Sequence, residues 1–247
     1  MDRQIGGVRA AAAIIRNGFV IAWTIVSAIA YGFTAMIVGV FSRNKARAVA
    51  RQWSLNLMFV TGVKLTVEGA ENIDKNKNYV FVANHQGYFD IPVLYAGLGS
   101  MLSFIAKKEL FRIPFFGWGM KAIGCINIDR SNPRKARKSI TRGVSVLKKN
   151  NISLVLFPEG TRSASGKVGE FKRASFTLAL ESGVPVVPVA ICGTREVQRK
   201  ESYRISPAAV RLVIGAPLNP HEGVVLDKEQ LAGIARETIL KAMERVA

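Results

Sequence analysis

The sequence predicts an α/β domain in which a central, mostly parallel or mixed sheet is flanked by helices, preceded by an N-terminal two-helix membrane anchor. From residue 60 onward, short apolar runs rich in β-branched and aromatic residues alternate with helical patterns, which is typical of α/β proteins. Ahead of them, residues 18–41 contain no charged side chain. We therefore divide the 247-residue chain into an anchor, residues 1–59, and an α/β domain, residues 60–247.

The first anchor helix is expected over residues 18–41. At about 1.5 Å per residue this stretch forms a helix about 36 Å long, enough to cross a hydrocarbon core of about 30 Å. It is longer than the apolar part of a signal peptide and ends without a small-residue cleavage site. Three arginines precede it and four basic residues follow within residues 43–51, so the positive-inside rule gives no orientation. A helix that spans the bilayer and one that enters a single leaflet both remain open.

The second anchor helix is expected over residues 45–60. Basic side chains alternate there with Trp53 and several aliphatic residues, which is the composition of a helix lying at a membrane interface. The alternative is a helix that packs on the soluble domain. We favour an anchor of two helices held at one face of the membrane.

The α/β domain is expected to contain seven strands and at least three helices. Continuously apolar strands of this kind belong in a sheet covered on both faces. The helix at the C-terminus begins with Asp227 and Gln230 in a capping-box arrangement. The predicted strands cover residues 63–67, 79–83, 102–106, 123–128, 153–157, 186–191 and 210–214, and the helices cover residues 134–149, 174–181 and 228–246.

The charge of the chain predicts an anionic partner. Thirty-five Lys and Arg against 17 Asp and Glu give a net charge of +18, and residues 107–149 alone hold twelve basic and two acidic side chains. Nucleic acid, an acidic lipid surface, a phosphorylated substrate and an acidic protein all fit such an excess. The two cysteines, Cys125 and Cys192, exclude a disulfide framework and a cysteine-built zinc site, and we expect no metal.

One of the two histidines stands where chemistry is expected. His85 follows the strand at 79–83 directly, within NHQGYFD (residues 84–90), and open α/β sheets bind ligands at this edge. Asp90 lies five positions later, where a turn brings its carboxylate back to the imidazole. A carboxylate on one ring nitrogen leaves the other nitrogen free as a base. Because neither a G-x-S-x-G elbow nor a catalytic-cysteine motif is present, we expect His85 to deprotonate a substrate hydroxyl.

A second motif, FPEGTRS (residues 157–163), follows the strand at 153–157. Gly160 and Thr161 allow a tight turn with free backbone N–H groups, and Arg162 offers a planar fork suited to phosphate. The spacing from Gly160 to Lys167 does not fit a P-loop. A third motif, GCINIDR (residues 124–130), delivers Arg130 to a strand end, and GVPVVPVAICGT (residues 183–194) is expected to be a buried strand.

In this order and spacing, the four motifs resemble those of the glycerophospholipid acyltransferase family, particularly its bacterial 1-acyl-sn-glycerol-3-phosphate acyltransferases. The N-H-x4-D motif alone is short, but the four together are highly specific. The resemblance implies transfer of an acyl chain from an acyl thioester to the sn-2 hydroxyl of lysophosphatidic acid, giving phosphatidic acid for phospholipid biosynthesis. His85 and Asp90 are then the catalytic pair.

The resemblance also implies the binding residues and the partners. Arg162 with Arg130 and Lys107 would hold the acceptor phosphate, while Glu159, Gly160 and Thr161 shape the loop. Acyl carrier protein or coenzyme A would bring the acyl chain as a co-substrate, without a further cofactor. Membrane phospholipids surround the anchor, and we expect the inner cell membrane with the active site on its cytoplasmic face.

Other functions remain as alternatives. Another lysolipid or glycerol 3-phosphate is a possible acceptor. A membrane-tethered nucleic-acid- or anion-binding protein would fit the charge, but residues 134–149 lack the aromatic side chains that stack on bases, so we expect no nucleic acid. A hydrolase using the same histidine is a third class, and it lacks a nucleophile in the sequence.

Overall fold

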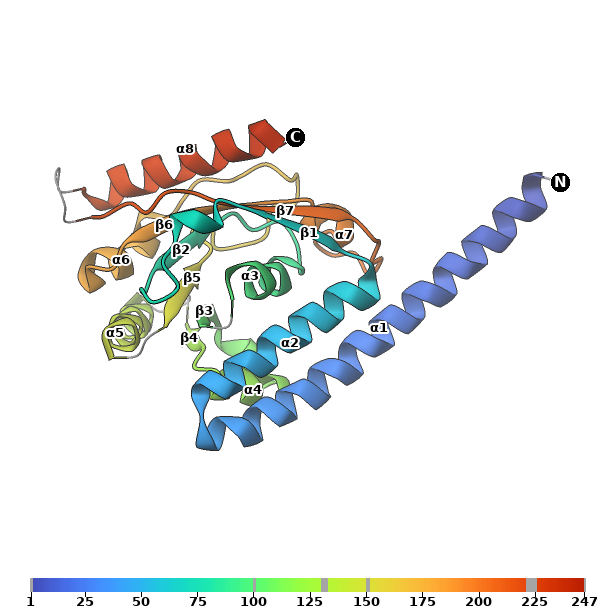
Figure 1. The fold of residues 1–247 in the computed structure, drawn as a ribbon, viewed down its shortest axis with the longest axis horizontal. Helices are drawn as coiled ribbons and strands as arrows, with labels where there is room; N and C mark the ends of the chain where they lie inside the picture. The colour runs from blue at the N-terminus through green and yellow to red at the C-terminus, as the bar shows by residue number, and fades with distance from the viewer. Residues whose placement is uncertain (1, 100, 130–132, 150–151, 221–225, 247) are drawn as a thin grey trace.

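The computed structural model describes residues 2–99, 101–129, 133–149, 152–220 and 226–246. Two helices come first, and strands alternating with helices follow (Figure 1). In chain order the elements are α1 (Asp2–Phe41), α2 (Arg43–Thr61), β1 (Lys64–Glu68), η1 (Ala70–Asn72), β2 (Val80–Ala83), α3 (Asp90–Leu98), β3 (Leu102–Lys107), η2 (Lys108–Arg112), α4 (Phe116–Ala122), β4 (Ile126–Ile128), α5 (Pro133–Lys149), β5 (Ser153–Leu156), η3 (Arg173–Phe176), α6 (Thr177–Ser182), β6 (Val186–Cys192), α7 (Thr194–Val197), β7 (Ala209–Ile214) and α8 (Lys228–Val246).

The seven strands form one mixed sheet in the order β1-β7-β6-β2-β5-β3-β4. Every pair is parallel except β6–β7, which is antiparallel. In the centre, β2 lies between β5 and β6, with Val82 opposite Leu156 on one side and Pro188 on the other. The predicted fold class, a mostly parallel or mixed sheet flanked by helices, is confirmed. Because the strands next to β2 run parallel to it, their carboxyl ends meet at one edge.

Each face of the sheet is covered by its own set of helices. Successive side chains of a strand point to opposite faces, so Phe81 and Ala83 enter one apolar core while Val80 and Val82 enter the other. The first core includes α2 and α3, and α1 and α4 lie on the same side; the second includes α5, α6 and α8 (Figure 1). This arrangement explains the continuously apolar strands of the sequence.

Helices α1 and α2 form a hairpin that lies against the α/β domain. Ser42 separates them and caps α2 by accepting a hydrogen bond from the Lys45 N–H. Gly32 permits close packing of α1 on α4, because a Cβ there would lie 2.8 Å from the Phe115 carbonyl oxygen. In α2, Leu57 and Met58 are buried in the same core as the sheet. The helix thus packs on the α/β domain, which is the alternative to a purely interfacial helix.

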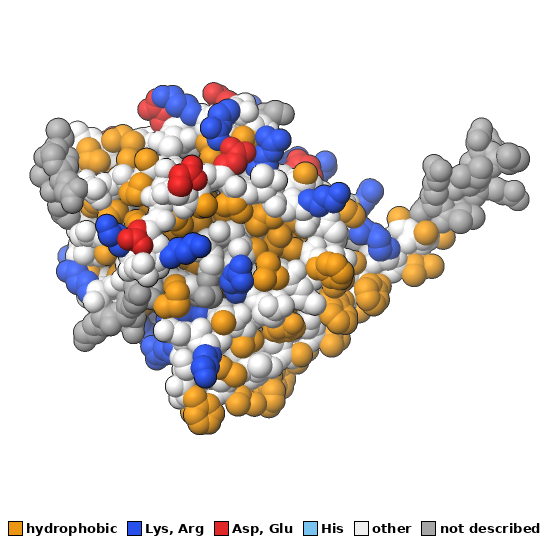
Figure 2. All heavy atoms as spheres, viewed as in Figure 1, with side chains coloured by type: hydrophobic (Ala, Val, Ile, Leu, Met, Phe, Trp, Pro, Cys, Tyr) orange, Lys and Arg blue, Asp and Glu red, His pale blue; other side chains and the backbone are white. Residues whose placement is uncertain are grey.

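The outer side of α1 is apolar and exposed (Figure 2). Residues 11–41 are long and apolar enough to cross a membrane, and 11% of the most apolar window is buried within the protein. Ile15, Val26 and Val40 are 73%, 63% and 78% exposed, although a soluble helix would turn such residues to the core. The long apolar N-terminal helix of the sequence analysis is therefore present, with its apolar side uncovered by the chain. The division of the chain at residue 59 stays a prediction.

Candidate active site

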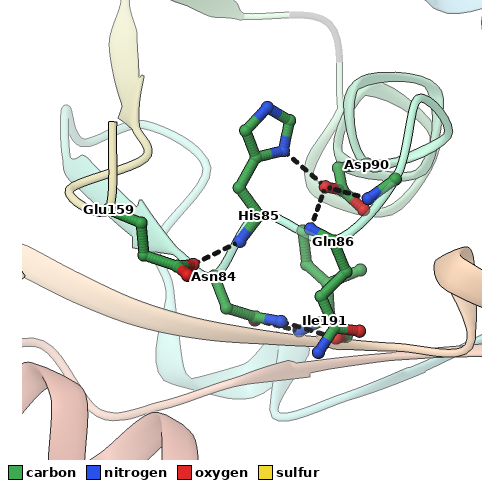
Figure 3. A network of polar contacts seen from close by, with 7 residues as sticks. Asn84, His85, Gln86, Asp90, Glu159 and Ile191 are labelled. Atoms are coloured by element: carbon green, nitrogen blue, oxygen red, sulfur yellow. Dashed lines mark hydrogen bonds and ion pairs between the residues drawn. The ribbon is translucent and has the colours of Figure 1, made fainter. Parts of the chain in front are cut away.

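The central strand β2 ends in a backbone clamp at Asn84. Its side-chain amide donates a hydrogen bond to the Ile191 carbonyl at 2.9 Å and accepts one from the Ile191 N–H at 2.8 Å (Figure 3). The fully buried Asn84 thus fastens the end of β2 to β6 and satisfies the Ile191 backbone. The chain leaves the sheet at this point, so the next side chain, His85, stands at the carboxyl edge.

His85 is bound to the carboxylate of Asp90. The imidazole Nδ1 lies 2.6 Å from Asp90 Oδ2, which also accepts the backbone N–H groups of Gln86 at 2.8 Å and Gly87 at 3.0 Å. Asp90 is the first residue of α3 and is fully buried. The positive end of the helix dipole and three hydrogen-bond donors favour a carboxylate there. The carboxylate then requires the proton of a neutral imidazole to be on Nδ1, which leaves the Nε2 lone pair available.

The other side of the imidazole is held by an aromatic ring. Phe157 stacks on His85 with centroids 4.1 Å apart and an angle of 19° between the rings. Nε2 points away from Asp90 and from the hydrogen-bonded network (Figure 3), and the His85 side chain is 21% exposed. A group at this position can accept a proton from a molecule that reaches the edge of the sheet.

The loop after β5 is tied to the backbone of His85. The buried Glu159 accepts the His85 N–H at 2.7 Å with Oε1 (Figure 3). Its second oxygen, Oε2, accepts the Gly169 N–H at 2.9 Å. In return, the His85 carbonyl accepts the Ser163 N–H at 2.8 Å. Gly160 turns this loop with φ +76°, a conformation that favours glycine, and a Cβ there would lie 3.0 Å from Lys172 Nζ.

Arg162, on the loop after β5, contacts the segment that carries His85. Its guanidinium carbon is 3.6 Å from the centroid of the Tyr88 ring, a cation–π contact. Arg162 Nη1 is buried and has no hydrogen-bond acceptor among the described residues. A buried guanidinium N–H without an acceptor is costly, so this group suits an incoming anion.

The remaining predicted binding residues lie further from this cluster or outside it. Thr161 is exposed in the same loop. Lys107 is exposed at the end of β3, two strand positions from β2, and the neighbouring Lys108 pairs with Asp129 at 2.8 Å. Among the described residues, no contact joins Lys107 to His85. Arg130 lies outside the described residues.

Several residues of the site were missed in the sequence analysis. Tyr88 and Asn84 lie inside the N-H-x4-D segment, and Phe157 begins the second motif, so the same motifs contain them. Lys172 lies twelve residues beyond Gly160, and no local pattern connects the two. Over the described residues, no group of three or more His, Cys, Asp or Glu side chains could hold a metal ion.

An apolar cavity of about 160 Å³ adjoins the segment that carries His85 and Asp90. It lies between α1, α2, α3, β3 and α4, and it includes Ile91, which directly follows Asp90. Its lining residues are Ala28, Tyr31, Gly32, Ala35, Ala50, Trp53, Ile91, Tyr95, Phe104, Ala106, Leu110, Phe116, Gly119, Met120, Ile123 and Cys125. A hydrocarbon chain is the chemistry that such a wall accommodates.

The fold and the His85–Asp90 pair define an α/β protein with a hydrogen-bonded histidine and aspartate at the carboxyl edge of its sheet. Comparison with known proteins gives the particular family. The acyltransferase family model matches residues 64–192, more than half of the sequence, and the chain belongs to this family. The predicted family resemblance is therefore confirmed.

The matched proteins described next are all named as acyltransferases that act on a 1-acyl-sn-glycerophosphate. A chloroplast 1-acyl-sn-glycerol-3-phosphate acyltransferase of Arabidopsis thaliana is 35% identical over 76% of this chain and 52% of its own length. The protein of that name from Pseudomonas aeruginosa is 32% identical over 72% of this chain and 69% of its own. The crystal structure of PlsC, the 1-acyl-sn-glycerophosphate acyltransferase of Thermotoga maritima, matches with a TM-score of 0.81 and 28% identity, covering 96% of this chain and 98% of that one. The chain spans about half the length of several curated plant relatives that it matches.

Proposed function

We propose that this protein transfers an acyl chain from a thioester to the sn-2 hydroxyl of lysophosphatidic acid, producing phosphatidic acid. The observation that carries the proposal is the pair His85 and Asp90, joined at 2.6 Å, with Arg162 and its unpaired N–H on the neighbouring loop. A hydroxyl and a phosphate of one small headgroup need these two groups on adjacent segments. The names of the bacterial and plant relatives and of the matched structure support the same activity.

In the proposed mechanism, His85 acts first as a base and then as an acid. Nε2 takes the proton of the acceptor hydroxyl while the hydroxyl oxygen attacks the thioester carbonyl carbon. Asp90 stabilises the imidazolium that forms, because its carboxylate accepts the hydrogen bond from the Nδ1–H throughout. When the carbon–sulfur bond breaks, the thiolate leaves and takes the proton from Nε2. The ester is formed and the free imidazole is restored, so the atoms and charges balance.

The acceptor is held by its phosphate in this proposal. Arg162 supplies the guanidinium, and its orphaned Nη1 gains an acceptor when a phosphate oxygen binds. Glu159, Gly160 and Thr161 form the loop that presents it, while Lys107, at the end of β3, and Arg130, which follows β4 in the sequence, add positive charge. The acyl chain of the donor occupies the apolar cavity beside Ile91. Acyl carrier protein or coenzyme A supplies the thioester as a co-substrate.

We also propose that residues 1–59 anchor the enzyme to the inner membrane, with the site on the cytoplasmic face. The exposed apolar side of α1 supports contact with lipid. Lysophosphatidic acid and phosphatidic acid are amphiphiles, so an enzyme at the bilayer surface can bind them without removing their chains from it.

In the experiment, purified full-length protein in phospholipid vesicles is given several acceptors together with acyl thioesters. Lysophosphatidic acid, lysophosphatidylcholine, monoacylglycerol and glycerol 3-phosphate are compared, and the products are identified by mass spectrometry. We expect phosphatidic acid from lysophosphatidic acid, and a loss of at least about 10²-fold in turnover for His85→Ala. His221→Ala, which removes the second histidine of the chain, is the matched control. Near-normal turnover of His85→Ala would refute the proposed base, and preference for another acceptor would refute the substrate.

A further inference from the structure

Helix α5 is unusually basic. Pro133–Lys149 contains seven Lys and Arg and no Asp or Glu. Its apolar residues Ile140, Val144 and Leu147 pack into the core beneath the sheet. Gly143 lies so close to α6 that a Cβ there would be 2.4 Å from Leu178 Cδ1. These contacts fix the packed side of α5, and Arg134, Lys138 and Arg142 lie on the opposite, exposed side.

Three exposed cations form a stripe along that outer side. Arg134, Lys138 and Arg142 follow one another at intervals of four residues and therefore lie one above another on the helix. Like charges at this spacing repel each other and destabilise a helix by a few tenths of a kcal/mol per pair. Since the stripe does not stabilise the helix, its arrangement points to an anionic ligand.

The position of α5 identifies where this ligand comes from. α5 belongs to the core on one face of the sheet, whereas α1 and α2 lie on the other face (Figure 1). A bilayer that contacts the apolar side of α1 is thus on the far side of the sheet from the stripe. The anionic partner of the stripe therefore approaches from solution rather than from the lipid surface.

The stripe also begins at the edge of the sheet that carries the proposed active site. α5 follows β4, which runs parallel to β2 through β3 and β5, so β2 and β4 both end at the edge where His85 lies. Three strand spacings separate β4 from β2, a lateral distance of about 14 Å. A protein bound on α5 can reach His85 with a flexible arm of modest length.

We propose that α5 is the docking surface for the acidic protein that carries the acyl chain as a thioester on a flexible arm, an acyl carrier protein. The inference rests on the proposed function and assigns the donor for it. Complementary charge accelerates association and orients the encounter, and Arg134, Lys138 and Arg142 present that charge next to the sheet edge. The arm then carries the thioester to His85 while the carrier protein stays on the side facing away from the membrane.

The test replaces the three cations by glutamate in the full-length protein. R134E/K138E/R142E is compared with K64E/K75E/K77E, a reversal of equal size at exposed positions outside α5: Lys75 and Lys77 precede β2, and Lys64 begins β1 at the far end of the strand order. Two measurements are made in vesicles that contain anionic phospholipid: direct binding of acyl carrier protein, and steady-state kinetics with acyl carrier protein, acyl-coenzyme A and acyl-pantetheine as donors. Acyl-pantetheine carries the same thioester without the protein or the phosphates.

We expect R134E/K138E/R142E to weaken carrier binding and raise KM for the acyl carrier protein at least about tenfold, while kcat and the KM for acyl-pantetheine stay unchanged. The control variant keeps wild-type values with every donor. An equal rise in the KM for acyl-coenzyme A would identify a phosphate site instead and overturn the inference. A loss of vesicle binding by R134E/K138E/R142E would overturn it as well. If the wild-type protein turns over acyl-pantetheine but does not bind acyl carrier protein, the inference fails while the proposed function stands. Carrier binding that depends on the stripe without any acyl transfer would refute the proposed function alone.

Discussion

Glu159 Oε1 accepts the backbone N–H of His85 at 2.7 Å, so a buried carboxylate from the loop after β5 fixes the backbone of the proposed base. This loop follows β5, the strand next to β2, and the second carboxylate oxygen, Oε2, accepts the Gly169 N–H. The loop after β5, which we propose binds phosphate, and the proposed base are therefore one hydrogen-bonded unit. Glu159 holds this unit together without itself taking part in the proposed proton transfer.

Glu159→Gln should lower kcat and raise the KM for lysophosphatidic acid, because this side chain holds both the His85 backbone and the loop that carries Arg162. The amide keeps the shape of the side chain, but one of the two backbone N–H groups then faces an NH₂ group instead of an oxygen. Leaving a buried donor unpaired costs about 1–3 kcal/mol, so we expect a similar loss in the free energy of unfolding. Glu170→Gln, at the exposed neighbouring acid, is the control. If kcat is unchanged in Glu159→Gln, the contact from this loop does not position His85 for the reaction.

Asp90→Asn should reduce turnover by about 10²–10⁴-fold without unfolding the protein. The amide oxygen in the place of Oδ2 can still accept the Gln86 and Gly87 N–H groups and the Nδ1 proton, but a neutral amide no longer stabilises the imidazolium that forms when Nε2 takes a proton. Turnover is measured for Asp90→Asn, for His85→Ala and for the double variant. Because the two residues act as a unit, the double variant should be no slower than His85→Ala alone. Additive losses would show that Asp90 acts independently of the imidazole.

Tyr88→Leu should raise the KM for lysophosphatidic acid about two- to fivefold. The ring under Arg162 contributes about 0.5–1 kcal/mol at an exposed site, and Tyr88 is 48% exposed. Tyr88→Phe keeps the ring and serves as the control, with near-wild-type values. Monoacylglycerol, which lacks a phosphate, should give the same KM with both variants. A parallel rise for both acceptors would contradict a role of Tyr88 in positioning a phosphate ligand.

The sequence indicated the sheet and the central residues of the site for physical reasons that are visible in the structure. All seven strands were predicted, because a strand buried on both faces is continuously apolar, as β2 and β6 are. The capping box of α8 is confirmed, with Asp227 Oδ1 accepting the Gln230 N–H at 2.8 Å and Gln230 Oε1 accepting the Asp227 N–H at 3.0 Å. Strand composition and helix capping depend on residues close together in the chain, so they can be recognised in a single sequence.

The features that were missed depend on contacts between distant segments. Helices α3 and α4 are short and contain Pro92 or two glycines, so neither has a long amphipathic period. The Glu159 contact with the His85 backbone spans 74 residues, and no spacing rule predicts which carboxylate turns inward. The burial of Leu57 in the α/β core likewise depends on how α2 packs against α3, because its sequence fits an interface as well.

Cys125 should resist alkylation in the folded protein at pH 8. Burial raises the pKa of its thiol to about 11, so about one molecule in a thousand carries the reactive thiolate. Iodoacetamide labelling followed by mass spectrometry, in a Cys192→Ala background, checks this, and the same protein in urea should label readily. Between about pH 9 and 11 the unfolded thiol ionises while the folded one does not, so this group's contribution makes the folded state less stable as the pH rises. Rapid labelling at pH 8 would mean that the core around the cavity opens.

Val26→Asp/Val40→Asp should weaken binding of the full-length protein to vesicles at least about 10²-fold. The two valines lie on the same exposed side of α1 as Ile15, and each apolar side chain contributes about 1.5–3 kcal/mol when it leaves water. A charge at these positions removes that gain and adds the cost of burying a carboxylate. Sedimentation with vesicles gives the partition coefficient, and Gly233→Asp/Ile234→Asp adds the same charge to exposed positions on α8, on the other face of the sheet. If both variants bind vesicles as the wild type does, the apolar side of α1 is not the surface that contacts lipid.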